Sequence, residues 1–146
     1  MQYQDIYNLS KSFGPPKISL RDGQILDDYG SEKFSKLPID HKSPDDVKLE
    51  EIEYYGWVYP FLEPRDLIFY LYPLLVEFQK DMSLDCFDSF MYSMDRELEG
   101  LLESLSSEQV ATLKSAFELV WNLGGDDGSD WFGCPNLQKF IGITVK

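Results

Sequence analysis

The chain has 146 residues, 43% of them apolar and 15% aromatic, which suits one domain with a continuous core and excludes a disordered chain. Its 26 acidic residues against 13 basic ones give a formal net charge of −13 at pH 7. This charge argues against nucleic acid and anionic membranes as direct ligands and favours a basic protein as partner, although solubility alone also explains acidity in many proteins.

The N-terminal part is predicted to hold one short helix and a long irregular stretch. Residues 5–13 are expected to be helical, and Gly14 with the two prolines after it ends this helix. Residues 17–37 carry little helical periodicity and are broken by two glycines, so we expect loops or a short extended pair there.

A second helix is predicted to begin at Ser43 and to continue to about Tyr55. Ser43 caps free amides, Pro44 suits the first turn, and the aspartates that follow favour the positive end of the helix. Val47, Ile52 and Tyr55 are spaced for one inward face. The acidic residues left to solvent are Asp46, Glu50, Glu51 and Glu53. This exposed side is a candidate acidic surface.

Three long helices are predicted after it. Residues 64–80 are predicted to form a very apolar central helix. Pro73 must bend or divide it, because proline has no backbone N–H to donate to the carbonyl of Phe69. We expect a kink. Residues 84–105 repeat apolar side chains at threes and fours, and a further helix begins at Ser106 and ends at the glycine pair 124–125. After this helix we expect a turn-rich acidic loop, and a short strand can follow over residues 140–145.

The predicted fold is mainly α. The whole chain, residues 1–146, is expected to be a single acidic domain, a bundle of four to five helices with a kinked central helix and room for a small β element. The N-terminus lacks a basic region followed by an apolar stretch, so we expect a cytoplasmic protein without a signal peptide. The longest apolar run, residues 67–76, is about half the length that spans a bilayer. The oligomeric state is not indicated.

Catalytic and metal-binding patterns are weak in this sequence. His41 is the only histidine and has no nucleophile pattern beside it, and with Cys86 and Cys134 far apart a zinc site lacks enough ligands. The acidic turn 126–130 does not fit an EF-hand, because Trp131 stands where the required glycine belongs. We therefore expect no catalytic residue, cofactor or metal, and two buried thiols.

Protein binding is the function that we expect of the acidic surface and of the acidic turn near the C-terminus. Exposed aromatic side chains beside carboxylates provide the anchors that interfaces favour. The expected partner-binding residues are Asp45, Asp46, Glu50, Glu51, Glu53 and Tyr54, with Asp126, Asp127, Asp130 and Trp131 as a second group.

Three stretches carry a resemblance to known proteins. They are FGPP (13–16) with DDY (27–29), FLEPRDLIFYLYP (61–73), and LSSEQ (105–109). In these motifs, and over about residues 10–120, the chain resembles a family of small uncharacterised bacterial helical proteins. The resemblance implies a helical cytosolic bacterial protein and supplies no activity or catalytic residue. In size, acidity and lack of catalytic machinery the chain is also similar to bacterial immunity proteins of contact-dependent growth inhibition.

The leading hypothesis is an acidic, protein-binding inhibitor. It would be an immunity protein that neutralises a basic toxin, such as a nuclease, by occluding its active site or substrate groove. One alternative is an acidic scaffold or housekeeping module without an inhibitory role, and another is an enzyme with an unrecognised carboxylate site. The salt dependence of partner binding separates the inhibitor from the scaffold or housekeeping module, because a charge-driven complex weakens as ionic strength rises. An enzyme requires a deep pocket with convergent carboxylates.

Overall fold

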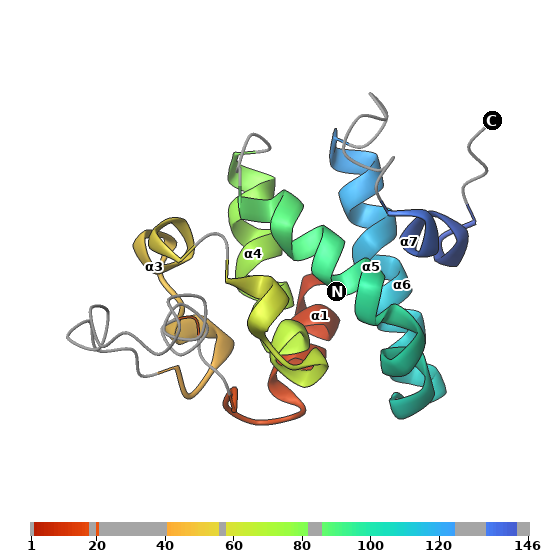
Figure 1. The fold of residues 1–146 in the computed structure, drawn as a ribbon, viewed down its shortest axis with the longest axis horizontal. Helices are drawn as coiled ribbons and strands as arrows, with labels where there is room; N and C mark the ends of the chain where they lie inside the picture. The colour runs from red at the N-terminus through yellow and green to blue at the C-terminus, as the bar shows by residue number, and fades with distance from the viewer. Residues whose placement is uncertain are drawn as a thin grey trace.

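The most apolar helix, α4 (Pro64–Lys80), lies at the centre of the fold. The computed structural model describes residues 2–17, 20, 41–55, 58–81, 86–124 and 134–142, and every regular element in these ranges is helical (Figure 1). The helix begins with Pro64 in its first turn, where the buried Asp66 carboxylate accepts the amides of Glu63 and Lys17 at 3.3 and 2.8 Å. The predicted mainly α class and the start of the central helix are confirmed.

Pro73 lies inside α4, and the helix continues through it instead of dividing there. One residue earlier, the backbone amide of Tyr72 donates to the hydroxyl of Ser10 at 3.0 Å. Ser10 is fully buried in α1 (Gln2–Lys11), so α1 packs against α4 at the proline. The bend expected at Pro73 stays a prediction.

The other long helices surround α4 and α1. Helix α1 lies between α4 and α6 (Ser107–Gly124), while α5 (Cys86–Ser104) packs against α4 (Figure 1). Between α4 and α5, the rings of Phe78 and Phe87 stack with centroids 4.3 Å apart. Each such buried side chain contributes about 1.5–3 kcal/mol relative to an exposed one, so the stacked pair stabilises the packing of α5 on α4.

The predicted start of α6 is confirmed in detail. Gln109 donates its amide to the Ser106 hydroxyl at 3.2 Å, and the Gln109 side chain accepts the Ser106 amide at 2.9 Å. This reciprocal capping satisfies two amides that the first turn leaves without helical partners.

The N-terminal helix, predicted over residues 5–13, spans Gln2–Lys11 instead, and two predicted elements differ in kind. The helix expected from Ser43 to Tyr55 is divided into η2 (Pro44–Asp46) and α3 (Leu49–Tyr54), because Val47 and Lys48 adopt extended backbone angles. The carboxylates of Asp46 and Glu51 each cap a separate helix start, so the segment has two short helices where one was predicted.

The strand suggested for residues 140–145 is wrong at its start. Phe140 ends helix α7 (Pro135–Phe140), and Gly142 follows in a turn with φ 80°, a left-handed angle that glycine adopts without strain. Residues 143–146 lie outside the described part. Helix α7 packs on α5 and lies toward the opposite end of the molecule from α3 (Figure 1).

None of the helices in the described ranges combines the length and apolar character needed to cross a bilayer.

Candidate partner-binding surface

The acidic segment, residues 41–55, is held against the core by its apolar side chains. Pro44, Ile52 and Tyr55 are buried, and η2 contacts both α4 and α1. The inward face predicted from Ile52 and Tyr55 is therefore confirmed, and Val47 is partly buried against the same core. This packing orients the opposite side of α3 outward.

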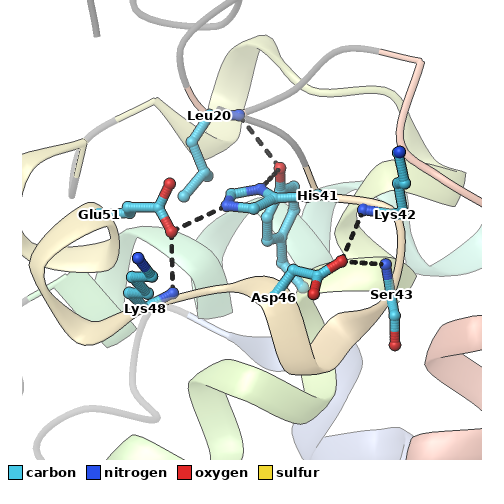
Figure 2. A network of polar contacts seen from close by, with 8 residues as sticks. Leu20, His41, Lys42, Ser43, Asp46, Lys48 and Glu51 are labelled. Carbon is cyan, nitrogen blue, oxygen red and sulfur yellow. Dashed lines mark hydrogen bonds and ion pairs between the residues drawn. The ribbon is translucent and has the colours of Figure 1, made fainter. Parts of the chain in front are cut away.

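His41 is the polar anchor of the acidic segment (Figure 2). Its ring is buried, with Nδ1 3.0 Å from the hydroxyl of Tyr70 and Nε2 3.0 Å from Oε1 of Glu51. The Tyr70 hydroxyl also accepts the amide of Leu20 at 3.2 Å. One imidazole thus links α3 to the central helix α4 and, through Tyr70, to the chain at Leu20.

Two acidic residues of the segment act as helix caps (Figure 2). Oε1 of Glu51 accepts the amide of Lys48 at 2.9 Å as well as bonding His41. Oδ2 of Asp46 accepts the amides of Lys42 and Ser43 at 3.0 and 2.9 Å. Both carboxylates therefore satisfy amides of the chain itself.

Asp45 connects the segment to α1. Its Oδ2 accepts the hydroxyl of Tyr7 at 2.9 Å, and the same hydroxyl lies 3.1 Å from the Ser43 side chain. The ring of Tyr7 packs edge-on against Tyr72 of α4, with centroids 5.1 Å apart. Asp45 is exposed but already has an internal partner.

Glu50 and Glu53 differ from these three acidic residues. Both are exposed, and neither carboxylate has a hydrogen-bond or ion-pair partner among the described residues. Around the helix the exposed side chains follow the order Leu49, Glu53, Glu50, Tyr54, since neighbours on a helix surface are three or four positions apart. Leu49 is 38% and Tyr54 56% exposed. We name these four residues the α3 face: two carboxylates side by side, with an apolar side chain at each edge.

The structure thus divides the residues expected to bind a partner. Asp45, Asp46 and Glu51 hold the segment together, and Glu51 is only 20% exposed at its side chain instead of facing solvent. Glu50, Glu53 and Tyr54 face outward as expected. The second group lies outside the described residues; it comprises Asp126, Asp127, Asp130 and Trp131.

Sequence reasoning missed three residues of this region. It gave His41 no role, placed Tyr70 only in the core, and left Leu49 unmentioned. A buried tyrosine needs a partner for its hydroxyl, which was a signal that a polar group lies near the middle of α4. The sequence did not indicate which group, because His41 and Tyr70 are 29 positions apart.

A shallow groove of about 370 Å³ lies between α1 and α6. Its lining consists of Asp5, Asn8, Leu9, Ser12, Glu108, Gln109, Ala111 and Thr112. Several polar groups here are bonded locally; for example, the Thr112 hydroxyl donates to the carbonyl of Glu108 at 3.1 Å. The two carboxylates of the lining, Asp5 and Glu108, belong to exposed residues, whereas a catalytic pocket brings its acids together in an enclosed site.

Within the described ranges, no group of three or more His, Cys, Asp or Glu residues is arranged to hold a metal ion. Cys134 is buried, as expected of a structural thiol.

Comparison with protein-family models, with curated proteins and with solved structures finds no match to this chain. The resemblances drawn from its motifs and general character therefore stay predictions.

Proposed function

We propose that this chain is an inhibitory binding protein that places the α3 face on a basic partner protein and covers a cationic active site or substrate groove. The observation that carries the proposal is the pair Glu50 and Glu53, two exposed carboxylates without a partner in the described part of the chain, between the exposed side chains of Leu49 and Tyr54. Interfaces combine such apolar anchors with charges that complement the other side.

The remaining charge of the chain supports the same proposal. A net charge of −13 steers a cationic partner toward the surface and speeds encounter by roughly 10- to 1,000-fold at low salt. A nuclease toxin fits this chemistry, because its substrate groove must be cationic to hold phosphates. In that case the chain is an immunity protein and acts in the cytoplasm.

The anchoring of α3 adds to the expected affinity. His41, Tyr7 and the two capping carboxylates hold the segment in place before a partner arrives. A surface that is ordered in advance loses less conformational entropy on binding than a loop that must become ordered.

The test begins with the immobilised chain and lysate from its source organism, at low and then high salt. A captured basic protein is then purified, and its affinity is measured for the wild type, for Glu50→Lys/Glu53→Lys, and for Glu103→Lys/Glu118→Lys. The last pair makes the same change in net charge at exposed positions of α5 and α6. Since a buried, paired interface charge is worth about 2–5 kcal/mol, we expect at least a 100-fold loss for the α3 variant only.

Three outcomes would count against the proposal. Equal losses for both variants would show that only the overall charge matters, and unchanged affinity would remove the α3 face from consideration. A partner that stays fully active in the complex would favour the scaffold alternative over inhibition.

A further inference from the structure

The order of side chains around α3 bears on which cation the surface accepts. Glu53 and Glu50 occupy the middle of the exposed arc, and their side chains are neighbours three positions apart, about 5–6 Å between Cβ atoms. Tyr54 lies beside Glu50 at one edge, and Leu49 lies beside Glu53 at the other. A cation that enters between the carboxylates therefore has an aromatic ring on one side.

The ring of Tyr54 is held in position by its neighbour. Its centroid is 4.9 Å from that of Tyr55 at an interplanar angle of 83°, and Tyr55 is only 2% exposed. Although more than half of Tyr54 is exposed, its ring packs edge to face on a core residue. An ordered exposed ring is a suitable platform for a planar group.

Guanidinium fits this arrangement better than ammonium does. It is planar, carries five N–H donors in a fixed fork that can bond two carboxylates at once, and stacks on aromatic rings. A lysine ammonium is a compact point charge with three donors and stacks poorly. The side chain of Leu49 offers an apolar contact for a residue next to the arginine in the partner.

We propose that the α3 face recognises an arginine of the basic partner, with the guanidinium bonded to Glu50 and Glu53 and laid on the ring of Tyr54. This inference rests on the proposed function and adds to it the kind of residue that the partner presents. According to this inference, the α3 face selects arginine instead of attracting any positive charge.

The test uses fluorescein-labelled hexa-arginine and hexa-lysine peptides, which carry equal charge, with the full chain in anisotropy titrations. For the wild type we expect the arginine peptide to bind about fivefold more tightly, the size of an exposed cation–π contact. Tyr54→Leu should lower the ratio of the two dissociation constants, because stacking is lost while both carboxylates remain, whereas Tyr54→Phe, which keeps the ring, should preserve it. Circular dichroism verifies that each variant is folded.

The carboxylates are tested in the same titrations. Glu50→Gln/Glu53→Gln should raise the dissociation constant of the arginine peptide at least tenfold. The control Glu103→Gln/Glu118→Gln should raise it far less. A wild-type ratio near one, a ratio that Tyr54→Leu leaves unchanged, or no binding of either peptide would overturn the arginine assignment. If both peptides bind equally and both depend on Glu50 and Glu53, only the arginine assignment fails and the proposed function stands.

Discussion

At the scale of single residues, His41 has the largest consequences for the candidate surface. Its ring is buried and bonds Glu51 of α3 and Tyr70 of α4, so replacing it with alanine removes both bonds and leaves a cavity between the two elements. We expect His41→Ala to lower the free energy of unfolding by about 3 kcal/mol. Urea unfolding followed by circular dichroism measures this.

The matched control for His41 is Lys114→Ala, at an exposed position of α6. Its effect should stay within about 0.5 kcal/mol, as is usual for surface changes. A loss below about 1 kcal/mol for His41→Ala would show that the network in Figure 2 contributes little to stability.

Tyr3 and Tyr7 form a second residue-scale comparison. The hydroxyl of Tyr3 is buried without a partner among the described residues, and burial, with Tyr72 nearby, raises the pKa of Tyr3 above its ordinary value of 10.0. The hydroxyl of Tyr7 instead donates to Asp45. At neutral pH we expect Tyr3→Phe to keep or slightly raise stability and Tyr7→Phe to cost about 1 kcal/mol.

The raised pKa of Tyr3 also sets a pH dependence. A group whose folded pKa lies above its unfolded value stabilises the fold fully below pH 10.0, and this contribution is lost as the pH rises through the folded pKa. Tyr3→Phe should therefore lose less stability than the wild type between about pH 9 and pH 11. Urea midpoints measured across this range decide the point, and parallel curves for the two proteins would refute it.

At the scale of elements, the helices with strong local signals were predictable. The start of α4 at Pro64 and the capping box of α6 at Ser106 depend on residues within one turn of the helix. The division of residues 43–55 was not predictable in this way, because it depends on which of several acidic side chains turns back to cap an amide. Likewise, Glu50 and Glu53 were identified from helical spacing, whereas the inward role of Glu51 depends on His41, ten positions away.

Helix α7 shows why a short element can escape prediction. Six residues are too few for a stable isolated helix, so its formation depends on tertiary contacts. The buried carboxylate of Asp95 in α5 accepts the amide of Leu137 at 2.8 Å, and the Asn136 side chain donates to the Asp95 carbonyl at 3.2 Å. The cap lies 42 positions from the amide that it satisfies, and no local pattern reveals it.

This cap leads to a prediction about α7. Asp95→Ala removes the acceptor of a buried amide, which costs about 1–3 kcal/mol, so amide hydrogen exchange over residues 135–142 should become about tenfold faster or more. Asp95→Asn keeps an oxygen in place and should have a smaller effect. Exchange measured by mass spectrometry resolves this segment; unchanged rates in Asp95→Ala would mean that packing alone holds α7.

At the scale of the whole molecule, the net charge of −13 is poorly compensated within the described part of the chain. The pairs Lys17–Glu63, Lys80–Glu77 and Arg96–Glu97 have N–O distances of 3.3, 3.4 and 3.1 Å, and in each the basic side chain is more than half exposed. Exposed pairs contribute about 0–1 kcal/mol each. Repulsion between the remaining carboxylates therefore opposes folding, and the same excess charge attracts a cationic partner.

Salt should act on these two properties with opposite signs. Raising NaCl from about 10 to about 300 mM shortens the screening length from about 30 Å to below 10 Å, so the melting temperature of the free chain should rise by several degrees. Over the same range the complex with a basic partner, or with the arginine peptide, should weaken.

Glu103→Lys/Glu118→Lys reduces the charge excess by four units and should show a smaller rise in melting temperature. A melting temperature that falls with salt would mean that the few surface ion pairs outweigh the repulsion. A complex insensitive to salt would mean that apolar contacts of Leu49 and Tyr54, and not the carboxylates, dominate binding at the α3 face.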